Sequence, residues 1–175
     1  MKNTTRIVWM LAVLSTFAVA ANAQAAGKSA ENGASTPPAV MEIAQATRVI
    51  RGEFGLFSED ADGGEPHFVR SKTVPLVPGQ SYGWVIAVRS NQQRIHWREE
   101  LTLPASPATW GAPETQGRRA LSDDGRVAIT EREVDLGDGL IYNAWDVAAG
   151  DPQGRYRIRV FVEGTLAKVF EFDVR

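Results

Sequence analysis

Strict alternation of apolar and other side chains near the C-terminus constrains the fold of this chain more than any other feature. Tyr156, Ile158, Val160 and Val162 alternate with three arginines and a phenylalanine. A two-residue period puts successive side chains on opposite faces of a β-strand, and it does not match the 3.6-residue period of a helix. The segment is therefore predicted to be a strand with one buried face.

A second alternating run follows directly, after a short segment that contains Gly164. A one-residue slip would turn one of the two apolar sets toward solvent, so only an even register keeps both on one face. Pairing Val162 with Leu166 meets this condition and leaves a three-residue loop. It also sets two arginines of the first run opposite Glu171 and Asp173, which is favourable cross-strand pairing.

The same pattern of short strands and turns begins at about residue 41 and continues to this hairpin. Residues 94–103 alternate cleanly, and only Glu99 breaks their apolar face. We expect one strand over residues 68–74, a bulge or bend where Gly52 and Gly55 interrupt the first strands, and a long loop over residues 104–125. No segment has a convincing amphipathic helical pattern.

This pattern predicts an all-β fold, an antiparallel two-sheet sandwich of about seven or eight strands. An immunoglobulin-like arrangement is favoured over a jelly roll at this length, and a small barrel is the main alternative. Residues 39–175 are expected to form this single domain.

The first 23 residues have the pattern of a secretory signal. Lys2 and Arg6 precede an apolar run, and the small residues Ala21-Asn22-Ala23 form a cleavage site. We interpret 1–23 as a cleaved signal peptide and 24–38, rich in Ala, Gly, Ser and Pro, as a flexible linker. Without a later hydrophobic span, the mature protein is expected to be periplasmic or secreted, with no transmembrane segment.

Composition narrows the classes of partner and cofactor. The formal net charge of −2 offers no basic footprint for nucleic acid, so we expect no nucleic-acid partner. The chain has no cysteine, which removes disulfides and thiolate metal ligands. No cofactor motif is present, and none is expected.

Several segments resemble a known group of proteins. Four segments are similar to small exported bacterial immunoglobulin-like β-sandwich domains of unknown function. They are residues 52–57, residues 74–83, Gly150-Asp151-Pro152 through Tyr156, and residues 170–174. The resemblance covers roughly residues 41–175. It implies the sandwich fold and an exported location, and it implies no catalytic residue.

One loop carries a candidate metal site. Asp60, Asp62 and Glu65 crowd residues 58–66, and carboxylate oxygens in a flexible loop suit calcium. The spaced carboxylates of an EF-hand are missing. A solvated acidic loop is the alternative interpretation.

Two sequence patterns suggest catalysis, and each also has a purely structural interpretation. Gly79-Gln80-Ser81-Tyr82-Gly83 matches G-x-S-x-G, but a nucleophile elbow needs a helix after the serine and a strand is expected here. Glu131, Glu133 and Asp135 fall on one strand face, where carboxylates could act on a glycan or form a solvated sheet face.

Trp110 is the strongest candidate for binding. It stands in the proline-rich 104–125 loop, whereas Trp84, Trp97 and Trp145 lie in expected strands and are assigned to the core. Trp110 could anchor a partner or ligand, or fold back over the edge of the sandwich. We therefore expect an exported, non-enzymatic binding or accessory domain that contacts a protein or a cell-envelope ligand. An envelope glycan-binding or glycan-hydrolysing protein is the alternative.

Overall fold

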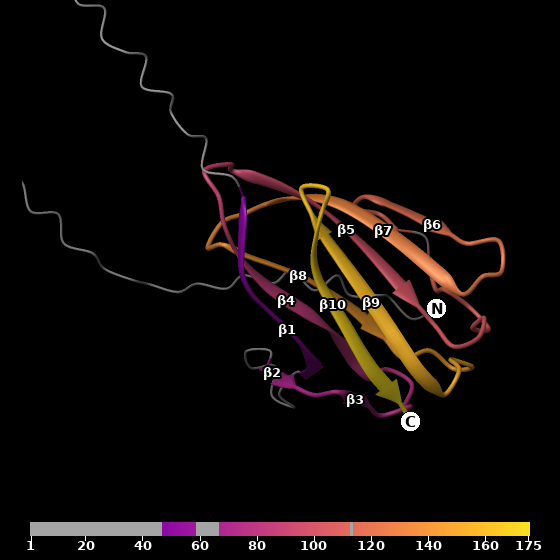
Figure 1. The fold of residues 1–175 in the computed structure, drawn as a ribbon. Helices are drawn as coiled ribbons and strands as arrows, with labels where there is room; N and C mark the ends of the chain where they lie inside the picture. The colour runs from indigo at the N-terminus through magenta and orange to yellow at the C-terminus, as the bar shows by residue number, and fades with distance from the viewer. Residues whose placement is uncertain (1–46, 59–66, 113) are drawn as a thin grey trace, which may run out of the picture. The chain divides into compact units, whose positions relative to one another are not determined.

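The computed structural model describes residues 47–58, 67–112 and 114–175, and these form two β-sheets without a helix (Figure 1). The segments expected to be a signal peptide and a linker, and residues 59–66, lie outside the described residues. The described part contains ten strands rather than the seven or eight expected. They are β1 (Arg48–Ser58), β2 (His67–Arg70), β3 (Thr73–Val74), β4 (Ser81–Arg89), β5 (Arg94–Thr102), β6 (Arg118–Leu121), β7 (Val127–Asp135), β8 (Leu140–Asp146), β9 (Gly154–Val162) and β10 (Thr165–Val174).

The strands divide into a four-stranded sheet and a six-stranded sheet. The four-stranded sheet has the order β2-β1-β4-β8, and the six-stranded sheet has the order β3-β10-β9-β5-β7-β6. All neighbours are antiparallel except β3 and β10, which are parallel. The expected antiparallel sandwich is therefore confirmed, with one parallel pair as its exception.

The core lies between the two sheets and is built by the alternating residues. Ile95, Trp97 and Leu101 of β5 are at most 1% exposed, and they face Trp84 and Ile86 of β4. The rings of Trp84 and Trp97 meet edge to face, with centroids 5.3 Å apart. Such contacts add to the stabilisation from burying apolar area.

The additional strands come from segments whose patterns are too short to show a period. The expected 68–74 strand is two strands, β2 and β3, in different sheets. Between them the Ser71 hydroxyl donates to the Thr73 carbonyl at 2.6 Å and turns the chain. The expected 104–125 loop likewise contains β6, a four-residue edge strand paired with β7.

The C-terminal hairpin, which ends at the C-terminus in Figure 1, has the expected register over most of its length. Arg157 faces Glu171 and Arg155 faces Asp173, as predicted. The tip differs, because Val162 pairs with Thr165 across a two-residue turn.

A bulge between Leu166 and Lys168 reconciles this tip with the expected register below it. One extra residue changes the parity of the strand. Leu166 consequently lies outside the core, 46% exposed, while Phe172 and Val174 face inward.

The irregularity in β1 lies before the glycines rather than at them. The register shifts between Val49 and Arg51. At Gly55 a Cβ would sit 2.1 Å from the Val69 carbonyl oxygen, so this glycine allows β2 to approach β1 closely.

Within the ranges that the structure describes, no helix could cross a membrane.

Candidate functional site

The 103–117 loop between β5 and β6 carries Trp110 and folds back against the sandwich. Trp110 is partly buried and packs against the core. Its indole Nε1 donates to the Gly125 carbonyl at 2.9 Å, across the turn between β6 and β7. The loop is thus fixed to the sheet by a hydrogen bond as well as by packing.

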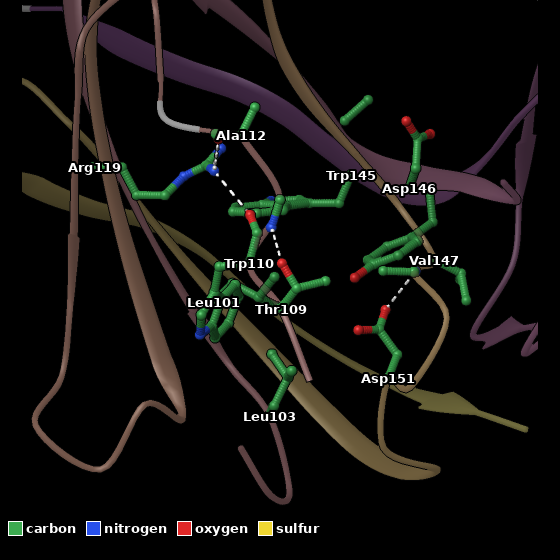
Figure 2. Close-up of a pocket in the computed structure, with 14 residues that line it drawn as sticks. Leu101, Leu103, Thr109, Trp110, Ala112, Arg119, Trp145, Asp146, Val147 and Asp151 are labelled. Carbon is green, nitrogen blue, oxygen red and sulfur yellow. Dashed lines mark hydrogen bonds between the residues drawn. The ribbon is translucent and has the colours of Figure 1, made fainter. Parts of the chain in front are cut away.

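Trp110 meets a second indole, that of Trp145 in β8. The two ring centroids are 5.9 Å apart with an interplanar angle of 68° (Figure 2). Trp145 is also partly buried against the core. Edge-to-face indoles of this kind hold each other's orientation.

Arg119 of β6 fastens the loop from the other side. Its Nη1 donates to the carbonyl oxygens of Trp110, at 3.2 Å, and Ala112, at 3.1 Å. Its guanidinium carbon lies 4.7 Å from the Trp145 ring centroid, a cation–π distance. Arg119 therefore ties the backbone of the loop to the indole of β8.

A carboxylate within the loop balances the positive charge. Glu114 Oε2 lies 2.7 Å from Nη2 of Arg132 and 3.4 Å from Nη2 of Arg119. Burial disfavours the charged form of Glu114, but the hydrogen bond and charge of Arg132 dominate and lower its pKa. The charge of Arg119 is thus already partnered.

The loop and the end of the sandwich enclose a pocket of about 330 Å³. Trp110 and Trp145 form its aromatic wall, and Arg119 lies beside them (Figure 2). The other lining residues are Tyr82, Leu101, Leu103, Thr109, Gly111, Ala112, Ala144, Asp146, Val147, Ala148 and Asp151.

Two carboxylates and a tyrosine hydroxyl are among the polar groups of this pocket. Asp146 ends β8, and Asp151 lies in the turn before β9 and accepts a hydrogen bond from the Ala148 N–H at 2.9 Å. Tyr82 is 3% exposed. Burial, with smaller contributions from Tyr156, Asp151, Glu99 and Asp146, raises the pKa of its hydroxyl, which stays protonated at neutral pH.

Glu99, the single exception to the apolar face of β5, is fully buried and contacts Trp145 of the pocket wall. The indole N–H of Trp145 donates to its Oε1 at 2.6 Å. Trp84 Nε1 and Asn143 Nδ2 donate to Oε2, the latter at 3.2 Å. Burial raises the pKa of Glu99 although these three hydrogen bonds oppose the rise. Glu99 therefore links the six-stranded sheet to the four-stranded sheet and orients Trp145.

The structure places two of the three expected core tryptophans as predicted, whereas Trp145 is only partly buried and lines the pocket. Trp84 and Trp97 are at most 1% exposed and belong to the core. Trp110 folds back and is partly buried, and it also lines the pocket, so it combines features of both interpretations.

The calcium candidates Asp60, Asp62 and Glu65 lie outside the described residues. Over the rest of the chain that the structure describes, no three His, Asp or Glu side chains gather as metal ligands.

The strand carboxylates of β7 form ion pairs along one sheet face. Glu131 pairs with Arg98 and Arg118, at 3.6 and 3.2 Å, and Arg94 pairs with both Glu133 and Asp135. None of the three carboxylates lines the pocket. The solvated, charge-paired face is the interpretation that this arrangement favours.

Ser81 of the G-x-S-x-G pattern begins β4 and is followed by a strand, not a helix. Gly83 lets β8 approach, because a Cβ there would lie 2.0 Å from the Asn143 carbonyl oxygen. The pattern thus marks a turn and a close strand contact.

Sequence reasoning identified Trp110 but missed the residues around it. Glu99 was visible as a break in alternation. Asp146, Asp151 and Arg119 carried no signal, because they come together only when β6, β8 and the turn before β9 meet at one end of the sandwich.

A family model described as the PM0630 beta sandwich domain matches residues 52–175. Among solved structures, an immunoglobulin-like protein from Pseudomonas aeruginosa is similar, with a TM-score of 0.52 and 18% identity. That match covers 76% of this chain and 99% of the other. At this identity the likeness shows the fold alone, a bacterial immunoglobulin-like β-sandwich.

A second similarity carries no argument. The alkylpurine DNA glycosylase AlkC from Pseudomonas fluorescens, solved with DNA containing an abasic site analogue, gives a TM-score of 0.36 at 12% identity. The match covers 71% of this chain and 30% of the glycosylase. A comparison with curated proteins gives no match.

Proposed function

The chain belongs to the PM0630 beta sandwich domain family, and on this premise we propose that it is an exported, non-enzymatic binding or accessory domain. It acts by contact with a protein or a cell-envelope ligand, and the contact is made at the pocket beside Trp110 and Trp145. The signal-like pattern of residues 1–23 supports export to the periplasm or the medium.

The pocket between the two indoles is the observation that carries this proposal. Its volume of about 330 Å³ is at the lower end of the range for ligand sites. That size suits one side chain or one sugar ring rather than a large cofactor. Arg119 and Glu99 hold the aromatic wall in place before any ligand arrives, which lowers the entropic cost of binding.

A binding role is favoured over catalysis by the chemistry of the side chains. Ser81 enters a strand without the helix that a nucleophile elbow requires. The carboxylates considered for glycan hydrolysis are engaged with arginines and lie outside the pocket. A glycan ligand remains compatible with the indoles and is included in the test.

The indole N–H resonances of the full chain provide a direct test. Trp110 and Trp145 line the pocket, whereas Trp84 and Trp97 are core residues and serve as internal references. Titration with soluble peptidoglycan fragments and short peptides is expected to shift the first two signals in a saturable way. If every probe leaves the Trp110 and Trp145 signals in place, the proposal is wrong.

A further inference from the structure

We propose that the pocket beside Trp110 and Trp145 binds a cationic group, an ammonium or a guanidinium, which enters between the indoles and the carboxylates of Asp146 and Asp151. This inference rests on the proposed function and adds the chemical class of the ligand. Two sources could supply such a group, namely a lysine or arginine side chain of a protein and a free polyamine.

Most carboxylate oxygens of Asp146 and Asp151 accept no hydrogen bond from the described residues. Among the residues that the structure describes, no hydrogen bond or ion pair engages the Asp146 carboxylate. Asp151 uses Oδ2 to accept the Ala148 N–H, which leaves Oδ1 for a ligand. Two carboxylates with spare acceptor capacity favour a donor that carries positive charge.

Tyr82 adds a hydroxyl at the same place. Its side chain is almost entirely buried, yet it lines the pocket and makes no hydrogen bond within the described residues. Asp146 and Asp151 line the same pocket as this hydroxyl. Burial, with smaller contributions from Tyr156, Asp151, Glu99 and Asp146, raises its pKa, so it stays protonated and can donate. A bound group that donates or accepts a hydrogen bond would pair with this hydroxyl at the pocket surface.

Arg119, the one cation among the described residues that line the pocket, does not cancel this negative charge. Arg119 is held by two carbonyl oxygens and by Glu114, and it covers the Trp145 ring. In Figure 2, Arg119 is drawn on the opposite side of the two indoles from Asp146 and Asp151. The indole faces attract cations through their quadrupole, so the aromatic wall and the carboxylates favour the same ligand.

The experiment compares blocked amino acids whose side chains differ in charge, together with one polyamine. The full chain is titrated with Nα-acetyl-lysine methylamide, its arginine, norleucine and glutamate analogues, and spermidine, and binding is followed on the Trp110 and Trp145 indole signals. The lysine or arginine analogue is expected to bind about tenfold more tightly than norleucine. Binding should weaken as salt is added.

Variants assign the effect to the pocket. Asp146→Asn is expected to weaken cation binding about tenfold, since it removes a charge-assisted partner. Tyr82→Phe should weaken it less, because only a neutral hydroxyl is lost. Asp135→Asn is the matched control: it removes one carboxylate charge at the end of β7, outside the pocket, and should change affinity about twofold or less. Unchanged Trp84 and Trp97 signals verify folding.

The outcomes separate the two proposals. Binding by amino-acid analogues but not spermidine assigns the cation to a protein side chain, and binding by spermidine alone assigns it to a free polyamine. The proposal of a cationic ligand is wrong if norleucine or glutamate binds as tightly as lysine, or if the Asp146→Asn variant keeps full affinity. In either case the proposal of a binding pocket still stands. Failure of these probes and of the glycans overturns both.

Discussion

At the scale of single residues, Glu99 has the greatest influence on how the two sheets are joined. It sits in β5 with no exposed surface and accepts hydrogen bonds from three side chains of the opposing sheet. Because buried polar groups are costly unless they are satisfied, this carboxyl stabilises only the one arrangement that supplies all three donors.

Glu99 also makes stability depend on pH. Burial raises its pKa in the folded protein, so as pH increases the unfolded chain loses this proton first. The contribution of Glu99 is fully present below its ordinary pKa and is lost as pH rises through the folded-state value. We expect the wild type to lose stability relative to Glu99→Gln as pH rises from about 4 to about 9. Urea unfolding at both pH values measures this, and a constant difference between the two proteins would contradict it.

At the scale of elements, glycines fix two strand contacts for different reasons. Gly83 allows β4 and β8 to approach, and a Cβ there would meet the Asn143 carbonyl oxygen at 2.0 Å. Gly164 ends the β9–β10 turn with φ 75°, and no atom lies within 4 Å of its Cβ position. The first glycine is required by space and the second by backbone conformation.

Replacing Gly83 should separate the strands that carry the pocket. Gly83→Ala is expected to lower the free energy of unfolding by about 1–3 kcal/mol, the typical cost of overpacking. Ser81→Ala, two residues earlier in the same strand, is the control. Denaturant unfolding measures both, and equal stabilities would show that β8 shifts away at little cost.

Replacing Gly164 isolates the cost of a left-handed backbone. Gly164→Ala is expected to lose about 1–2 kcal/mol, because an L-residue at positive φ crowds its own carbonyl while no neighbour is displaced. Thr165→Ala at the next position is the comparison. A Gly164→Ala protein with the melting temperature of the wild type would rule out the two-residue turn.

At the scale of the whole molecule, the 103–117 loop closes one end of the sandwich. Trp110 reaches the β6–β7 turn through its Nε1 bond to Gly125 and reaches β8 through the Trp145 ring. Arg119 holds the same loop by two carbonyls. The loop is therefore part of the packed structure as well as a wall of the pocket.

Trp110 should consequently contribute to both stability and binding. Trp110→Ala is expected to reduce the free energy of unfolding by about 1–3 kcal/mol, less than a fully buried tryptophan, since the ring is only partly buried. Trp110→Phe keeps an aromatic ring, loses the Gly125 bond and should cost about 1 kcal/mol. Thermal and urea unfolding test this order, and an unaffected Trp110→Ala protein would show that the loop is not packed.

The sequence by itself determined the sandwich, its main strands and most of one hairpin register. These follow from side-chain alternation, which is local and survives in any chain that buries one face of a sheet. The bulge after Leu166 was missed because one extra residue at a hairpin tip leaves the periodic pattern unchanged below it.

Tertiary structure alone decided the pocket and the partners of Glu99. The alternation pattern identified Glu99 as an exception, and the proline-rich loop identified Trp110. Neither pattern predicts which residues of the opposite sheet contact these side chains. Asn143 and Trp145 lie more than forty positions from Glu99 and reach it only because β8 stacks over β5. Contacts between layers depend on how two sheets are placed against each other, and no local period encodes that placement.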